Sequence, residues 1–577
     1  MDDAVDELRA YAYGFDRALS TTELRAALTA SGGNVDATCG SFGLPPRRLV
    51  ERARSTKNAY SSPLEVPVTP KQSEAVDQVS PLPDRHFLRL SPGHHAAPAG
   101  LQIEQLHLLV GKPPASELSE PPEPQPSRVR ALVVGAITIG AALVHAVTTL
   151  LRAPPAAPAV APTIDRGDTA WMLVCTMAVL LMVPGLGLFE AGLLRAKNSV
   201  SVLMQCFAGL ALLSVLWFLC GFSLCFSETD LGLVGGLEHV GLAGIGLSPL
   251  AAAPTIPGVL FVAFQGMFAA ITPLLCTGAF AERLKFEAFL TFILVWSLLV
   301  YYPLCHWVWG GGWLARLGVV DFAGGIVIHT SAGVASLVSA VMLGPRHDFG
   351  SASAALAPHN LPMAATGAGL LWFGWFSFNA GSSLGAGGLA ASTMMTTHIA
   401  GSAGAVAWLV LDWCFVGRPT FVGAINGAIG ALAGVTPASG FITPASGFVV
   451  GLLCGVGSYG GVLLFKERLG IDDALDVSSV HGLTGVIGSL LIGVYATSDV
   501  NPDGPNGVLY DGGLAQLGLQ ALGVVVAAGW AGAGTWLVMA ATEKVFKGAR
   551  INRDVENRGL DRSQHGESSY QDLTALV

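Results

Sequence analysis

From residue 129 onward, apolar stretches long enough to cross a bilayer follow one another along the chain. A helix of roughly 17 to 25 apolar residues spans the hydrocarbon core of a membrane. We place such helices at 131–151, 169–194, 199–226, 258–281, 286–304, 324–343, 361–382, 387–414, 420–435, 442–465, 478–496 and 514–542. The pattern therefore predicts an all-α, polytopic membrane protein with one leading span at 129–152 and eleven further spans.

Composition agrees with this prediction. The chain has 577 residues, of which 52% are hydrophobic and only 12% are charged, against about 25% charged in soluble domains. The net charge of -9 argues against a nucleic-acid partner. Nine cysteines are too few for a disulfide scaffold, and eight of them lie in apolar runs, where they act as small hydrophobic residues.

Basic residues fall in alternate loops, which sets the orientation. Every second loop contains lysine or arginine: Arg195 and Lys197, Arg283 and Lys285, Arg346, Arg418, Lys466 and Arg468, and Lys544 and Lys547. Arg316 is the exception. The alternation predicts a cytoplasmic carboxyl-terminal tail at 546–577 and an external start of the eleven-span block. The leading span would return the amino terminus to the cytoplasm, or act as a signal anchor or cleaved targeting element.

A weak internal repeat divides the eleven spans. Aspartate, histidine and glycine recur at intervals of eight and four residues, as Asp321–His329–Gly333 and Asp473–His481–Gly485. The stretches FEAG (189–192) and FNAG (378–381) also match each other. Because five spans are an odd number, two such units in tandem have opposite topology. We therefore predict a five-plus-five inverted repeat with an eleventh helix, whose transport path lies between the halves near the midplane.

Two histidines are the polar residues of greatest interest inside these spans. His329 and His481 occupy matching mid-span positions, and a neutral imidazole offers one hydrogen-bond donor and one acceptor. A stacked pair would line a narrow pore for a small polar molecule or a proton. Either histidine alone could instead be a packing residue that bonds a backbone carbonyl. A metal site is disfavoured, because no third ligand lies nearby at suitable spacing.

Aromatic residues gather at span ends on the predicted outer side. Phe264 and Phe268 lie in FQGMFAAIT, Trp309 lies in HWVWGGGW and Phe378 lies in WFGWFSFNAGSS. Ring faces attract a desolvated cation, although an interfacial aromatic belt is the alternative interpretation. For three tryptophans we favour that interpretation or simple helix packing: Trp307, Trp313 and Trp375.

Five sequence blocks resemble the ammonium transporter family (Amt, Mep and the related Rh proteins). They are GDTAWMLVCTMAVLLMVPGLGLFEAGLLRAKNSVSVLMQ, HWVWGGGWLARLGVVDFAGGIVIHTSAGVASLV, HNLPMAATGAGLLWFGWFSFNAGSS, GVTPASGFITP and DDALDVSSVHGLTGVIGSLLIGV. They stand in family order and cover about residues 166–545. The resemblance implies a homotrimer in the lipid bilayer, with eleven spans and one pore per subunit, that takes ammonium or ammonia as substrate, with methylammonium as a further candidate. It implies no cofactor and no enzymatic activity.

The resemblance also assigns roles to individual residues. It places an outer cation-recruitment site at Trp309, Phe268 and Ser382, and a phenyl gate at Phe268 and Phe378. The pore lining would consist of His329, His481 and Thr436, and Asp321 would be a buried carboxylate that supports the recruitment site without touching the ion. Two departures stand out. Glu190 stands where many members have a tyrosine-glycine pair, although some subfamilies also carry glutamate, and SSVHG replaces the more usual FGVHG before the second histidine.

These observations lead to one main hypothesis about function and one alternative. The main hypothesis is that the protein recruits ammonium, removes its proton and conducts ammonia, and we expect it in the plasma membrane. The alternative is an ammonium sensor that signals through its soluble extensions. An intramembrane metalloenzyme is disfavoured, because the chain lacks both metal ligands and a nucleophile.

The amino-terminal region has its own weak resemblance. Residues 1–45 resemble a ubiquitin-associated helical module through Gly14-Phe15 and the stretch Ser31–Ala37, which would imply a ubiquitin-like partner. A short amphipathic helical pair without a partner, or part of a disordered tail, is the alternative. Residues 46–128 are rich in proline, serine and charged residues and read as a disordered linker.

Overall fold

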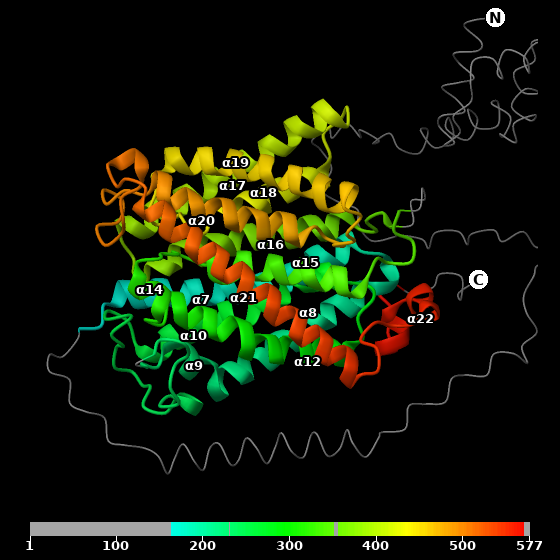
Figure 1. Cartoon of the computed structure of the whole chain (residues 1–577), viewed down its shortest axis with the longest axis horizontal. Helices are drawn as coiled ribbons and strands as arrows, with labels where there is room; N and C mark the ends of the chain where they lie inside the picture. The colour runs from blue at the N-terminus through cyan, green and yellow to red at the C-terminus, as the bar shows by residue number, and fades with distance from the viewer. Residues whose placement is uncertain (1–162, 230, 351–355, 571–577) are drawn as a thin grey trace, which may run out of the picture. The chain divides into compact units, whose positions relative to one another are not determined.

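The computed structural model describes residues 163–229, 231–350 and 356–570. The predicted module at 1–45, the linker at 46–128 and the leading span at 129–152 lie outside the described residues. Within the described residues there are helices and loops but no strands (Figure 1). The all-α prediction is confirmed.

The amino-terminal half of the described region contains the helices that correspond to the first five predicted spans of the repeat. Their bounds are α7 (Arg166–Leu193), η2 (Ala196–Asn198), α8 (Ser199–Leu216), η3 (Trp217–Gly221), α9 (Phe222–Phe226), η4 (Val240–Leu242), α10 (Gly258–Leu274), α11 (Thr277–Phe280), α12 (Phe286–Trp296), η5 (Ser297–Tyr301), α13 (Tyr302–Val308), α14 (Trp313–Leu317), η6 (Gly325–Thr330) and α15 (Ser331–Leu343).

The carboxyl-terminal half continues in the same way. Its helices are α16 (Leu361–Ala380), η8 (Gly381–Ser383), α17 (Gly388–Phe415), α18 (Phe421–Val435), α19 (Pro444–Val462), η9 (Leu463–Arg468), η10 (Ser478–Leu483), α20 (Thr484–Tyr495), η11 (Val508–Tyr510), α21 (Ala515–Val545), α22 (Arg553–Arg558) and η12 (Asp561–His565).

Nine helices among the described residues are long and apolar enough to cross a membrane. They cover Arg166–Leu193, Ala196–Phe226, Gly258–Phe280, Phe286–Leu317, Gly325–Leu343, Gly388–Phe415, Pro444–Arg468, Ser478–Tyr495 and Ala515–Val545. Two more helices, α16 and the shorter α18, coincide with the predicted spans at 361–382 and 420–435. The protein is a multi-pass membrane protein. The count of eleven spans stays a prediction.

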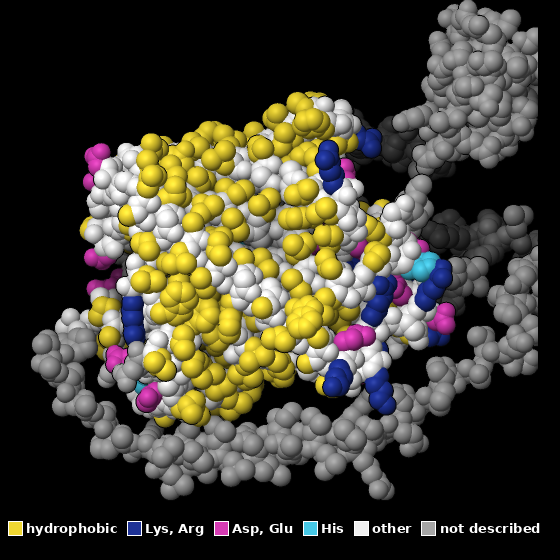
Figure 2. Space-filling view, in the orientation of Figure 1, with side chains coloured by type: hydrophobic (Ala, Val, Ile, Leu, Met, Phe, Trp, Pro, Cys, Tyr) yellow, Lys and Arg dark blue, Asp and Glu magenta, His cyan; other side chains and the backbone are white. Residues whose placement is uncertain are grey.

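The contacts between helices are those expected of two repeated halves. The first helices of the two halves, α7 and α16, lie against each other, and α17 packs against both α18 and α19. The long helix α21 crosses the outside of α12, α15 and α20 (Figure 1). Apolar side chains cover the face shown in Figure 2, while lysine and arginine gather toward the end that carries α22. We call this end the basic end.

Glycines at the repeated spacing allow the two halves to cross closely. A Cβ atom at Gly333 would lie 2.1 Å from the Cα atom of Gly482, and one at Gly485 would lie 2.9 Å from the Cβ atom of His329. Each glycine follows one histidine by four residues, which is about one helical turn, and contacts the segment that carries the other. The repeated spacing of histidine and glycine therefore brings His329 and His481 together.

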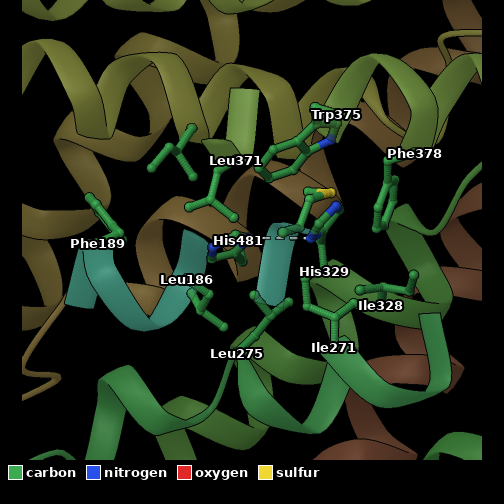
Figure 3. A pocket seen from close by; sticks show the side chains of 12 residues that line it. Leu186, Phe189, Ile271, Leu275, Ile328, His329, Leu371, Trp375, Phe378 and His481 are labelled. Carbon is green, nitrogen blue, oxygen red and sulfur yellow. Dashed lines mark hydrogen bonds between the residues drawn. The ribbon is translucent and has the colours of Figure 1, made fainter. Parts of the chain in front are cut away.

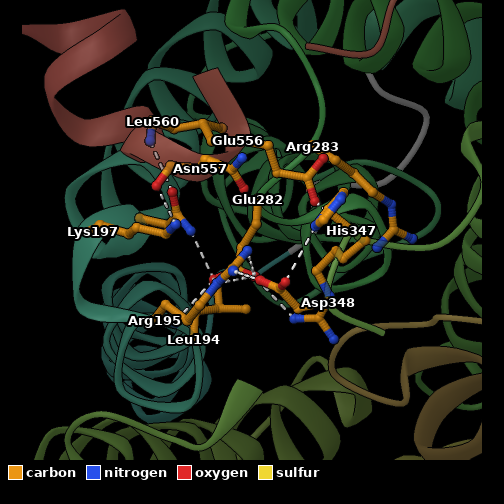
Figure 4. A network of polar contacts seen from close by, with 12 residues as sticks. Leu194, Arg195, Lys197, Glu282, Arg283, His347, Asp348, Glu556, Asn557 and Leu560 are labelled. Atoms are coloured by element: carbon orange, nitrogen blue, oxygen red, sulfur yellow. Dashed lines mark hydrogen bonds and ion pairs between the residues drawn. The ribbon is translucent and has the colours of Figure 1, made fainter. Parts of the chain in front are cut away.

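A cluster of buried ion pairs ties the loops together at the basic end (Figure 4). Arg346 bonds both Glu282 at 3.1 Å and Asp472 at 2.9 Å, Arg283 bonds Asp472 at 3.1 Å, and Arg195 bonds Glu282 at 2.9 Å. Burial opposes ionisation of both carboxyl groups, but the arginines outweigh it and hold the pKa of Glu282 and of Asp472 below the usual range. The cluster therefore stabilises the fold at neutral pH and loses this effect as the pH falls below about 4.

Replacing Asp472 by alanine is expected to lower the free energy of unfolding by about 3–5 kcal/mol. The change leaves the fully buried Arg283 without an ionic partner and removes one of two partners from Arg346. Thermal unfolding of the purified protein in detergent measures the loss. The matched control is Asp348→Ala. Asp348 is an ionic partner of Arg195 with one third of its side chain exposed, so its loss should cost less than about 1 kcal/mol. Equal losses in the two variants would contradict the prediction.

The carboxyl-terminal segment packs on the start of α8 at the same end. Asp561 accepts hydrogen bonds from the backbone N–H groups of Val200 and Ser201, at 3.1 and 2.8 Å. Leu560 donates its backbone N–H to Asn198, and Lys197 donates to the carbonyl of Asn557. The described part of the predicted tail, 546–570, is therefore attached to the helical bundle at the basic end.

Candidate transport pathway

The two repeat-related histidines meet in the middle of the helical bundle. Their Nδ1 atoms lie 3.2 Å apart, and their rings are nearly parallel with centroids 5.2 Å apart. Both side chains are buried. Each lies in a π-helical segment, η6 for His329 and η10 for His481; such segments are rare and occur often at functional sites. One ring must donate and the other accept, so the two imidazoles are present as different tautomers.

A small apolar cavity adjoins this pair (Figure 3). It has about 20 Å³ of room for water-sized molecules, which is enough for about one such molecule. Apart from the histidines, its lining is entirely hydrophobic or aromatic: Met182, Leu186, Phe189, Ile271, Leu275, Ile328, Leu371, Trp375, Phe378 and Ile429. The Nε2 atom of His329 is buried and has no hydrogen-bond partner among the described residues. A polar guest in this cavity would therefore bond an imidazole.

Two phenyl rings separate this cavity from an outer pocket. Phe268 and Phe378 pack edge to face with centroids 4.5 Å apart, and both are buried. Phe268 lines the outer pocket and Phe378 lines the inner cavity. Phe264 packs edge to face against Phe268 at 4.8 Å. The rings therefore close the path between the two compartments in this conformation.

The outer pocket brings together the other residues expected at the recruitment site. Trp309, Phe268, Ser382 and Asp321 all line it, and it offers about 160 Å³ to water-sized molecules. The indole N–H of Trp309 donates to the backbone carbonyl of Asp321 at 2.8 Å, which fixes the ring. The hydroxyl of Ser382 donates to the carbonyl of Phe378 at 2.8 Å, so its oxygen is left to accept hydrogen bonds.

Asp321 holds the start of η6. Its Oδ1 atom accepts the N–H groups of Gly324 and Gly325, both at 2.8 Å, and its Oδ2 atom accepts those of Ile326 and Val327 at 2.7 and 3.0 Å. Each oxygen thus accepts two hydrogen bonds. These four bonds fill the acceptor positions of a carboxylate, so none is left for a proton. The residue satisfies the free N–H groups of the helix terminus and positions the segment that carries His329.

Thr436 lies behind the cavity instead of on its wall. Its hydroxyl accepts the indole N–H of Trp375 at 2.9 Å and donates to the carbonyl of Leu432 at 2.7 Å. Trp375 in turn stacks on both histidines, with centroids 5.6 Å from His329 and 6.3 Å from His481. Trp375 is buried in the core, as its assignment to packing predicts, and its ring also forms part of the cavity wall.

Comparison with known proteins decides which family this arrangement belongs to. The family model described as "Ammonium Transporter Family" matches residues 170–570. The chain belongs to the ammonium transporter family. It is 49% identical over 412 residues to ammonium transporter 1 of Dictyostelium discoideum, which covers 71% of this chain and 88% of that protein. The curated relatives are named as transporters.

Solved structures of the family share its fold. The crystal structure of Saccharomyces cerevisiae Mep2 superposes with a TM-score of 0.66 at 35% identity, over 72% of this chain and 93% of that one. A structure titled "Sensor Amt Protein" matches with a TM-score of 0.64 at 29% identity, over 69% of this chain and 98% of that one. The Amt-type fold of this ammonium transporter family member is thereby confirmed.

One polar residue of the pathway in this family member had not been predicted. Gln265 lines the outer pocket, and its Oε1 atom is buried without a hydrogen-bond partner among the described residues. It precedes Phe268 by three residues in the stretch FQGMF, so an amide about one helical turn from a phenylalanine expected at the site was the available signal. Its oxygen adds an acceptor beside Ser382 and the aromatic rings.

Proposed function

We propose that the protein recruits ammonium at the outer pocket, removes one proton and conducts ammonia past His329 and His481. The observation that supports this most directly is the pair of facing imidazoles next to a cavity whose other walls are apolar. Uptake of labelled methylammonium by cells that lack their own transporters tests the activity. Cells that express the chain should accumulate the label, and cells that carry the empty vector should not.

The outer pocket has the groups that a desolvated cation requires. The faces of Trp309 and Phe268 attract positive charge, and the oxygens of Ser382 and Gln265 accept hydrogen bonds from N–H groups. Potassium is similar to ammonium in size but cannot donate hydrogen bonds. Recruitment alone therefore gives a modest preference for ammonium.

The phenyl rings and the apolar cavity supply the stronger selection. Transfer of a charged group into such surroundings is costly, and the pKa of a buried amine can fall by up to 3–5 units. Ammonium can avoid most of that cost by losing a proton, whereas potassium cannot. Ammonia then needs only a hydrogen-bond partner inside, which the imidazoles provide.

Replacing Trp309 by leucine should raise the ammonium concentration needed for half-maximal uptake by roughly 2- to 30-fold. The estimate corresponds to loss of a cation–π interaction of about 0.5–2 kcal/mol. The maximal rate should change little, because the inner cavity is untouched. The measurement is uptake in liposomes over a range of ammonium concentrations. Trp313→Leu, which alters a ring packed on Trp307, is the control. An unchanged concentration dependence in Trp309→Leu would remove this residue from the site.

Three further assignments rest on family membership. We infer that the protein forms a homotrimer, resides in the plasma membrane and exposes the basic end to the cytoplasm. A second candidate function is ammonium sensing, which the match to a structure titled as a sensor Amt protein favours. Flux measured after deletion of residues 1–128 distinguishes the two, because a transporter keeps its flux while a pure sensor has little flux with or without the extension.

A further inference from the structure

Glu190 is a buried carboxyl group one residue beyond the wall of the inner cavity, on the side toward the basic end. It lies in α7 directly after Phe189, which lines the cavity, and only 2% of its surface is exposed. Helix α7 continues for three residues to Leu193 before the loop that carries Arg195. Molecules that leave the cavity past Phe189 toward the basic end therefore pass the level of Glu190.

The hydrogen-bond geometry around Glu190 accommodates a proton on the carboxyl group. The hydroxyl oxygen of Thr277 lies 2.5 Å from the carbonyl oxygen of Leu274 and 2.7 Å from Oε2 of Glu190. A hydroxyl has one hydrogen, and a carbonyl can only accept. If Thr277 donates to Leu274, the hydrogen in its contact with Glu190 must come from Glu190. A proton on Oε2 satisfies both short contacts at once.

Other buried carboxylates of the protein are compensated in ways that Glu190 is not. Glu282 and Asp472 are paired with arginines, and Asp321 accepts four backbone N–H groups. The carboxyl group of Glu190 lies against Gly278 and contacts the hydroxyl of Thr277. No basic group pairs with it among the described residues. A buried carboxyl group without a cation is far less costly when neutral.

A second unpaired carboxylate lies on the neighbouring loop. Asp473 is 2% exposed; its Oδ2 atom accepts the N–H and hydroxyl of Ser478, both at 2.6 Å, while its Oδ1 atom is buried without a partner. The loop packs on Gly278 through the hydrogen bond from Leu475 N–H to the Gly278 carbonyl at 3.2 Å. A Cβ atom at Gly278 would lie 3.1 Å from Oε1 of Glu190. Glu190 and the loop of Asp473 therefore meet at this glycine.

The same loop connects this site to the histidine pair. Asp473 precedes His481 by eight residues, and Ser478, which it holds, is the first residue of η10. Two other titratable groups lie near Glu190: Cys206 of α8 and Cys276, which directly precedes α11. Asp476, farther along the loop, is paired with Lys466 at 2.5 Å. Glu190 and Asp473 are thus the two acid groups available for proton transfer here.

We propose that Glu190, with Asp473 as its neighbouring carboxylate, is the proton donor that converts ammonia to ammonium on the cytoplasmic side of the pore. The inference rests on the proposed function. In the step, the O–H bond of the Glu190 carboxyl group breaks and a new N–H bond forms on ammonia, which leaves a carboxylate and ammonium. The carboxylate then regains a proton from cytoplasmic water. Formation of the ion at this point prevents its return through the apolar cavity.

Infrared spectroscopy of the purified full-length protein tests the proton directly. The wild type should show a carboxylic-acid C=O stretch at neutral pH that is lost in Glu190→Gln. Glu287→Gln, which alters an exposed glutamate in the first turn of α12, is the matched control and should keep the band. A spectrum unchanged by Glu190→Gln overturns the proposal, whatever the transport activity.

Transport in liposomes tests the role of the proton. We expect Glu190→Gln to lower the initial rate of ammonium uptake at least tenfold and to flatten its dependence on the pH of the cytoplasmic side. Glu190→Asp should restore part of both, and Glu287→Gln should behave as the wild type. If the wild type transports and Glu190→Gln is equally active with the same pH profile, this proposal is wrong. If the wild type itself has no flux, the proposed function is wrong.

Discussion

Simultaneous replacement of His329 and His481 by alanine is expected to abolish selective ammonium conduction. Among the described residues of the inner cavity wall, the two imidazoles are the polar groups that can bond a guest, because the indole N–H of Trp375 is already bonded to Thr436. Without them a molecule of ammonia in the cavity has no hydrogen-bond partner, and an unsatisfied polar group costs about 1–3 kcal/mol. Removal of two rings also opens space for water, which would let hydrated ions enter. Flux should therefore either stop or lose its preference for ammonium over potassium.

Liposomes that contain the purified protein provide the measurement, with ammonium and potassium gradients applied separately. His398→Ala is the matched control, because this exposed histidine lies on α17 and is absent from the cavity wall. Single replacements should be milder, since one imidazole can still offer a donor or an acceptor. Normal discrimination between ammonium and potassium in the double variant would count decisively against the proposed mechanism.

The facing histidines could be predicted from the sequence because the signal was periodic. Spans of suitable length predict the bundle, and the repeated spacing of His329 with Gly333 and His481 with Gly485 predicts two equivalent segments. The structure adds the reason: each glycine allows the opposite segment to approach. The sequence does not predict that both histidines lie in π-helical segments, because that depends on how Asp321 and the loop before His481 hold the helix starts.

Residues whose role depends on a distant partner could not be assigned in advance. Trp375 has the same local pattern as a packing tryptophan, and its role follows from stacking on His481, more than a hundred residues away. The ion cluster joins Arg195, Glu282, Arg346 and Asp472 from four separate loops. Basic residues in alternate loops indicate topology, but they do not indicate which carboxylate each one meets.

The assignment of a proton to Glu190 likewise depends on a contact between residues far apart in the sequence. A glutamate in FEAG is a visible departure from the tyrosine-glycine pair of many members, yet its protonation depends on Thr277, which is 87 residues away. In the sequence alone this glutamate could equally have been an ion-paired residue. Its consequence for transport therefore follows from the structure.

Replacing Asp321 by alanine is expected to destabilise the protein by about 4 kcal/mol. Four backbone N–H groups at the start of η6 would lose their acceptor, and each buried donor left unsatisfied costs about 1–3 kcal/mol. Water in the outer pocket can replace part of this loss, because Asp321 lines that pocket. Asp321→Asn should also destabilise the protein. The NH2 group of the asparagine would replace one carboxylate oxygen, so its two N–H donors would face two backbone N–H donors.

The size of this effect distinguishes a helix-positioning carboxylate from an ordinary cap. Asp165 at the start of α7 accepts a single backbone N–H, from Asp168 at 2.8 Å, in an exposed setting. Asp165→Ala is therefore the matched control and should cost about 0.5–2 kcal/mol. Thermal unfolding in detergent compares the two variants. Because the four bonds position the segment of His329, Asp321→Ala should also lose ammonium selectivity at temperatures where it stays folded. Equal unfolding temperatures for the two variants would show that these four bonds do not hold η6 in place.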